Sequence, residues 1–298
     1  MGAALELSGL EAAEVAKLVA ELPDEELRKA LKGDARAAAL DEIFRRFPEF
    51  VDRRRTKGVD AVIEWCISRN GRGAADRYVV ELRNGDCRAG RDIEGEPGVS
   101  FKLDAVDLLR LVTATASAQI MVVTGRMKVT GDPELAIRTA GFFKVAGGNR
   151  RVDVEPASVD AIELARAVRS ARDDDLREAL RGPLREVILG EVFRRFPEYL
   201  DPSAAQGMDA AIKWKLGGRA NGEHDRWVVE LRKGKCVTGK QLEAEPRATL
   251  VLGAAEFLKL VTGNANPTTM FLTGKLRVKG DLLFAASLPR IFRIPSPG

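Results

Sequence analysis

The sequence is poor in the residues on which most catalytic and metal chemistry depends. Its 298 residues include one histidine, His224, and three cysteines, Cys66, Cys87 and Cys236. A single histidine excludes multi-histidine metal sites and limits any histidine-containing nucleophilic triad to one position. Three cysteines with no close pair argue against a disulfide scaffold or a zinc site, and they favour a reducing compartment. We therefore expect a cytoplasmic protein with no metal and no cofactor.

Long apolar runs and aromatic residues are also scarce. No run approaches the roughly 18 to 20 apolar residues of a membrane-spanning helix, and the acidic start of the chain is unlike a secretory signal. The net charge is only +4, from 48 basic and 44 acidic residues, and aromatic residues make up 6%. A basic stripe interleaved with aromatics would be a more convincing sign of nucleic-acid binding, so no nucleic-acid partner is expected. Transient attraction to an anionic membrane surface remains compatible with this charge.

The chain consists of two copies of one unit. The string FRRFPEF begins at Phe44, and FRRFPEY begins at Phe193, 149 positions later. The same offset relates further pairs of residues: Trp65 and Trp214, Cys87 and Cys236, and Phe143 and Phe292. Because 149 is half of the chain length, we predict two domains, residues 1–149 and 150–298, which could pack as a pseudo-dimer.

Each copy starts with helical periodicity and then changes to strand periodicity. Apolar residues recur with helical spacing up to Phe47, and Pro48 or Pro197 marks the end of this region. In Ile212–Leu216 the period is two, so the apolar side chains point inward and the lysines outward. A glycine turn, further strands, a helix, a strand between two glycines and a last helix follow. Each copy is therefore predicted to be α+β with a mostly antiparallel sheet.

The strings TGRMKVTGD (residues 124–132) and TGKLRVKGD (residues 273–281) complete this pattern. Together with the inward tryptophan, the glycine turn and the Glu-Pro before the fourth strand, it resembles the sterol carrier protein 2 (SCP2) domain family, over roughly residues 60–143 and 209–292. The resemblance implies two SCP2-like domains, each a twisted, mainly antiparallel five-stranded sheet covered by helices, preceded here by extra N-terminal helices. It also implies an apolar tunnel for a sterol, a fatty acid or a fatty acyl-CoA.

A lipid site needs a concave apolar wall and few polar groups. We predict this wall from the apolar residues of the matching elements, with the terminal helix of each copy bordering the cavity. The predicted lipid-binding residues of the second copy are Trp214, Leu252, Phe257, Leu260, Val261, Met270, Phe271, Leu276, Leu283, Phe284, Leu288 and Phe292. Those of the first copy are Trp65, Leu103, Leu108, Leu111, Met121, Met127, Leu135, Phe142 and Phe143.

The two copies differ at positions that bear on binding. The family commonly has glycine after the fourth helix, where Gly263 matches and the first copy has Ala114. Pro289 replaces Ala140, so the last helix of the second copy is expected to kink or stop early. We favour the second copy as the binding unit.

Three functional classes are compatible with these residues. The leading hypothesis is a non-enzymatic lipid-binding or lipid-carrier protein. The competing hypothesis is a non-catalytic scaffold or protein-interaction module of the same fold without an open cavity, because fold alone does not establish function. A lipid-modifying enzyme is the third, and its weakness is the lack of a convincing nucleophile–base pair.

Overall fold

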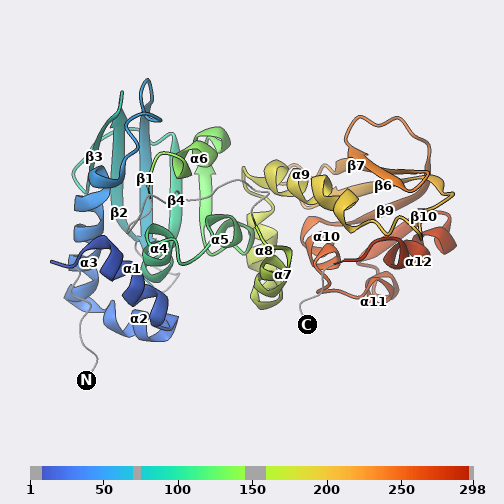
Figure 1. Ribbon diagram of the computed structural model, residues 1–298, viewed down its shortest axis with the longest axis horizontal. Coiled ribbons are helices and arrows are strands. Elements are labelled where there is room, and N and C mark those ends of the chain that lie inside the picture. The colour runs from blue at the N-terminus through green and yellow to red at the C-terminus, as the bar shows by residue number, and fades with distance from the viewer. Residues whose placement is uncertain (1–8, 70–74, 145–158, 295–298) are drawn as a thin grey trace. The chain divides into compact units, whose positions relative to one another are not determined.

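The computed structural model describes residues 9–69, 75–144 and 159–294. The chain divides into two compact units, Met1–Ser158 and Val159–Gly298, each with one five-stranded sheet and its own helices (Figure 1). The predicted boundary between residues 149 and 150 falls outside the described residues and stays a prediction. None of the helices within the described ranges is long and apolar enough to cross a bilayer.

Each unit begins with three helices and a short 3-10 turn. In the first unit these are α1 (Ala12–Glu21), α2 (Asp24–Ala30), α3 (Gly33–Arg46) and η1 (Phe47–Phe50). In the second unit they are α7 (Ala161–Ser170), α8 (Asp173–Ala179), α9 (Arg185–Arg195) and η3 (Phe196–Tyr199). Pro48 and Pro197 lie in the 3-10 turns, directly after the α-helices end. The predicted helix ends are therefore confirmed.

The two sheets have the same topology. The first contains β1 (Asp60–Ser68), β2 (Ala75–Arg83), β3 (Asp86–Gly90), β4 (Val99–Asp104) and β5 (Lys128–Gly131) in the order β3-β2-β1-β4-β5. The second contains β6 (Asp209–Gly217), β7 (Asp225–Arg232), β8 (Lys235–Gly239), β9 (Pro246–Gly253) and β10 (Leu276–Gly280) in the order β10-β9-β6-β7-β8. Only the β1–β4 and β6–β9 pairs are parallel. The predicted mainly antiparallel α+β fold is confirmed.

In each unit, two further helices link the fourth strand to the fifth along the chain, and one helix follows the fifth strand. They are α4 (Ala105–Val112), α5 (Ala118–Val123) and α6 (Pro133–Ala140) in the first unit, and α10 (Ala254–Val261), α11 (Pro267–Leu272) and α12 (Leu282–Ile291) in the second. Of the kink or early stop expected at Pro289, the early stop is wrong, because α12 continues to Ile291, and the kink stays a prediction. Ile291 is almost fully buried, and such tertiary packing outweighs the low helix propensity of one proline near a helix end.

The second glycine of each TG…GD string has a steric role. Gly131 and Gly280 both adopt a positive φ, 94° and 89°. A Cβ atom at either position would collide with a backbone oxygen, that of Gly98 or of Arg247. Only glycine combines this φ with such a close approach of two strands, which explains why both copies retain it.

The FRRFPE strings pack an aromatic cluster onto each sheet. In the first unit, the rings of Phe44 and Tyr78 stack with centroids 4.0 Å apart. In the second, Phe193 stacks on Trp227 at 4.5 Å, and Phe196 meets the inward Trp214 edge-on at 5.9 Å. The N-terminal helices therefore belong to the core of each unit.

Candidate functional site

A cavity of about 520 Å³ lies in the second unit. Its wall combines residues of the sheet with residues from the helices before and after it, so it is assembled from almost the whole length of the repeat. Volumes of this size are typical of small-molecule sites, which are mainly apolar and largely preformed.

Seven of the predicted lipid-binding residues lie in the wall of this cavity. They are Trp214, Leu260, Val261, Phe271, Leu276, Leu288 and Phe292. They come from β6, α10, α11, β10, α12 and the residue after α12, because these elements converge on one face of the sheet. Whether they contact a lipid stays a prediction.

The other five predicted residues of the second copy do not line the cavity. Leu252, Phe257, Met270 and Phe284 are buried in the surrounding core, and Phe257 stacks on Phe193 at 5.0 Å. Leu283 is 85% exposed. The sequence shows that these residues are apolar, but its periodicity could not separate residues that face the cavity from those that face the core or solvent.

The predicted residues of the first copy are mostly buried. Trp65, Leu103, Leu108, Leu111, Met121, Met127 and Phe142 are buried, and Leu135 and Phe143 are half-buried. The Trp65 ring lies 4.9 Å from that of Phe101 and 5.9 Å from that of Phe47. Lipid contact in this unit also stays a prediction.

One position next to the tryptophan distinguishes the two units. In the parallel strand pair, Trp65 lies beside Phe101, and Trp214 lies beside Leu250 at the same register. Leu250 lines the cavity of the second unit. A leucine is smaller than a phenylalanine, so the side chain beside Trp214 at this register fills less volume than Phe101 does beside Trp65.

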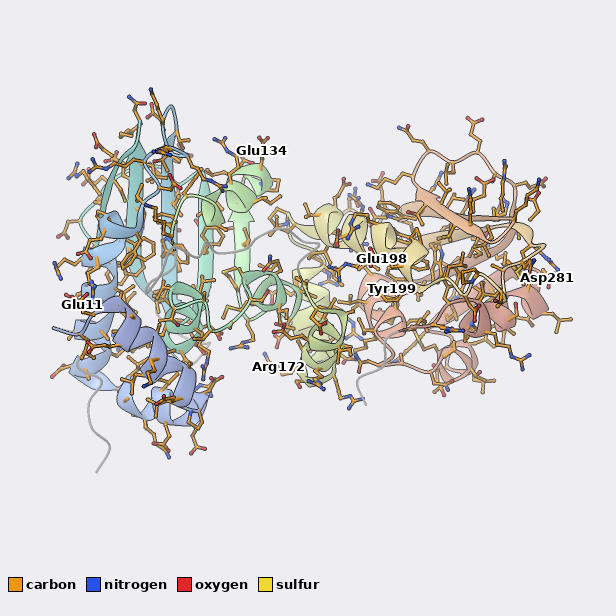
Figure 2. All side chains as sticks on the ribbon, in the orientation of Figure 1. Glu11, Glu134, Arg172, Glu198, Tyr199 and Asp281 are labelled. Atoms are coloured by element: carbon orange, nitrogen blue, oxygen red, sulfur yellow. The ribbon has the colours of Figure 1, made fainter. Side chains whose placement is uncertain are left out.

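Sequence reasoning missed the part of the wall contributed by the N-terminal helices. Ala161 and Leu164 on α7, Val192 on α9, and Phe196 and Tyr199 on η3 all line the cavity, and Figure 2 labels Tyr199. The recurrence of FRRFPEF and FRRFPEY was the available signal, since Phe196 and Tyr199 belong to that string. The further lining residues are Arg195, Thr262, Gly263, Ala265, Pro267, Thr268, Val278, Leu282, Ala285, Ala286, Pro289 and Ile294.

Few polar groups reach this cavity, and two of them are held by neighbours. The Thr262 hydroxyl donates to the carbonyl oxygen of Leu258 at 2.7 Å. Arg195 donates from Nε to Glu191 and from Nη1 to the carbonyl oxygen of Val159, both at 2.7 Å. The buried Trp214 Nε1 has no acceptor within the described residues. The wall is therefore suited to an apolar ligand with a small polar end.

The reactive side chains of the chain lie in unreactive settings. Burial raises the pKa of Cys87 and of Cys236 to about 12, so both thiols are protonated at neutral pH. His224 is exposed in the loop before β7. Within the described ranges, no three His, Cys, Asp or Glu side chains are grouped to hold a metal ion.

Known proteins resemble this chain in both halves. Residues 40–144 and 190–293 match the SCP-2 sterol transfer family. Hydroxysteroid dehydrogenase-like protein 2 of Xenopus tropicalis is 30% identical over 105 residues, 35% of this chain and 24% of that protein. Sterol carrier protein 2 of Gallus gallus is 28% identical over 103 residues, 34% of this chain and 19% of that protein. The chain thus matches a quarter or less of each of these two relatives.

A solved structure also resembles one repeat. The apo form of sterol carrier protein 2 from Yarrowia lipolytica is 29% identical, and the likeness covers 36% of this chain and 89% of that one with a TM-score of 0.30. The family match extends over more than half of the chain and occurs once in each unit. The chain therefore belongs to the SCP-2 sterol transfer family, as a tandem of two family domains.

Proposed function

We propose that this protein is a non-enzymatic lipid carrier that holds a sterol, a fatty acid or a fatty acyl-CoA in the cavity of its second unit. The observation that carries the proposal is the apolar cavity of about 520 Å³, whose wall includes Trp214, Leu250 and Phe292. The family description and the carrier named among the relatives support the same class of ligand.

The physical chemistry of such a cavity supports binding without any covalent step. Each methylene removed from water contributes about 0.8 kcal/mol, so a long acyl chain offers on the order of 10 kcal/mol before the costs of binding. A small polar end can stay near Thr262 or Tyr199 while the chain fills the apolar part. The protonated thiols and the exposed His224 offer no activated nucleophile, in keeping with a carrier. The three unbridged cysteines are consistent with a cytoplasmic location.

Leu250→Phe tests the cavity with a residue that the first unit already accommodates. The larger ring should fill the space beside Trp214, so affinity for a dansyl-labelled fatty acid should fall at least about tenfold. Phe101→Leu in the first unit is the matched control and should leave that affinity unchanged. Fluorescence titration measures affinity, and native mass spectrometry of the gently purified protein reports retained lipid and its stoichiometry.

The outcome distinguishes the carrier from the scaffold. Wild-type affinity in a folded Leu250→Phe variant would mean that the probe binds elsewhere. If the wild-type protein binds neither the fatty acid nor a fluorescent sterol, the scaffold without a ligand becomes the better explanation. The site would be established if the wild type and the Phe101→Leu control bound the probe and the Leu250→Phe variant did not.

A further inference from the structure

Four large apolar side chains are exposed beside the cavity. Phe271 and Leu272 on α11 are 42% and 77% exposed, and Leu282 and Leu283 on α12 are 50% and 85% exposed. We call these four residues the apolar patch. Phe271 and Leu282 also line the cavity, so the cavity reaches the surface within the patch. Figure 1 shows α11, β10 and α12 close together in the second unit.

The chain around the apolar patch is strongly basic. Residues 264–294 contain five basic residues and a single acidic one. The acidic residue, Asp281, is already bound to Arg247, with 2.8 Å between its Oδ2 and Nη2 of the arginine. Lys275, Arg277 and Lys279 are exposed between the two halves of the patch, and in the described part of the chain none of the three forms an ion pair. An exposed apolar surface is thus bordered by cations.

The first unit lacks this combination. The residues at the positions of Phe271 and Leu272 are Val122 and Val123, and Val123 is buried. The residues at the positions of Leu282 and Leu283 are Pro133 and Glu134, and Figure 2 labels Glu134. The apolar patch is therefore not a requirement of the fold, because the same elements form without it.

We propose that the apolar patch and its lysines dock the second unit on an anionic lipid bilayer, with the mouth of the cavity against the membrane. This inference rests on the proposed carrier function and names the surface through which lipid is exchanged. A bilayer surface offers both partners at once: an apolar layer for the four side chains and negative charge for the cations. A lipid leaving the cavity beside Phe271 and Leu282 then enters the bilayer without crossing water.

Flotation with lipid vesicles tests the apolar part of the surface. We expect the ligand-free wild type to bind phosphatidylglycerol-containing vesicles and to bind pure phosphatidylcholine vesicles at least about tenfold more weakly. Leu272→Ser combined with Leu283→Glu, the latter being the residue of the first repeat, should reduce binding to the anionic vesicles at least about tenfold. Val237→Glu is the control, because Val237 is an exposed apolar residue on β8, at the opposite edge of the sheet; it should bind like the wild type.

Charge reversal tests the cationic part. Lys275→Glu combined with Lys279→Glu should weaken binding to anionic vesicles and reduce its dependence on salt concentration. The matched control reverses two exposed lysines at the opposite edge, Lys233→Glu with Lys235→Glu, and should retain most of the binding. Equal loss in the two charge variants would show that net charge and not this surface determines binding, and would overturn the proposal.

A third measurement separates docking from lipid binding. In the absence of vesicles, the apolar-patch variant should bind the dansyl-labelled fatty acid with wild-type affinity, and only its transfer to anionic vesicles should slow. If the wild-type protein did not bind the dansyl-labelled fatty acid, the carrier function itself would be contradicted. Sedimentation without vesicles measures the oligomeric state of the wild type and of the apolar-patch variant. If the variant changed the oligomeric state but kept full vesicle binding, the patch would be a contact between protein chains. That result would overturn the docking proposal.

Discussion

At the scale of single residues, Asp107 is a buried acid on α4 whose surroundings oppose its ionisation. Burial, together with the charge of Asp104, raises the pKa of Asp107 to about 6, although Arg126 binds this carboxylate and acts in the opposite direction. The folded state therefore holds the Asp107 proton at pH values where the unfolded chain has already lost it.

The consequence is a stability that decreases with rising pH. Between about pH 4 and pH 6 the folded first unit binds more protons at Asp107 than the unfolded chain, so this residue makes the free energy of unfolding fall by on the order of 2 kcal/mol. Asp107→Asn should remove this part of the slope. Denaturant unfolding of the first unit at several pH values measures it, with the second unit as the reference. An unchanged slope in the variant would contradict the assignment.

At the scale of elements, an ion pair that is buried in the second unit and half-buried in the first fixes the third helix of each unit to the sheet. Nε of Arg185 on α9 lies 2.7 Å from Oδ2 of Asp225 on β7, and Nη2 donates to the carbonyl oxygens of Leu216 and Gly217 at the end of β6. Arg36 binds Asp76 and the end of β1 in the same way. Both arginines precede the family matches, which begin at residues 40 and 190, so the extra helices are attached to each family domain by specific contacts.

Removing one charge of this pair should destabilise the second unit strongly. Asp225→Asn leaves the buried Arg185 guanidinium without its carboxylate, and we expect a cost of about 3 kcal/mol in the free energy of unfolding. Asp209→Asn provides the control, since the pair of Asp209 with Arg232 is exposed and spans 4.0 Å, and it should cost less than about 1 kcal/mol. Urea unfolding compares the two variants, and equal costs would show that the Arg185 pair has no special role.

The elements were predictable because their periodicity is local, whereas the cavity was not. The alternation in Ile212–Leu216 identified β6 correctly, and the glycine strings placed β10. The sequence predicts that the difference between Ala114 and Gly263 bears on binding. Both residues adopt a similar positive φ, 51° and 69°, which costs the alanine a strain of about 1 kcal/mol. Periodicity predicts which side chains point inward. Whether these side chains contact one another or leave a cavity depends on the volumes of side chains from distant segments such as α7.

At the scale of the whole molecule, duplication has produced two units of equal topology whose interior side chains differ at individual positions. The first unit places Phe101 against Trp65, and the second leaves a cavity beside Leu250 and Trp214. The family match and the common topology explain what the units share. Side-chain size differs at single positions beside the tryptophans, with Phe101 in the first unit and Leu250 in the second.

Ligand binding should therefore stabilise one unit more than the other. We expect two thermal unfolding transitions. Saturating fatty acid should raise the midpoint temperature of the transition assigned to the second unit. At a ligand concentration a hundredfold above the dissociation constant, the free energy of unfolding of that unit should increase by about 2.7 kcal/mol. Asp225→Asn and Asp107→Asn identify the transitions, because each variant changes a different unit. Calorimetry with and without the fatty acid measures the shift. Equal shifts of both transitions would show that the first unit binds as well.

The shared register of Trp65 with Phe101 and of Trp214 with Leu250 has a practical consequence. Both tryptophan environments experience the same buffer, temperature and concentration in every sample, so errors of preparation affect them equally. The effect of a substitution near one tryptophan can be measured relative to the other tryptophan in the same polypeptide, without comparing two purified proteins. In this duplicated chain, each unit is therefore an internal reference for the effect of one aromatic side chain on the interior of the other.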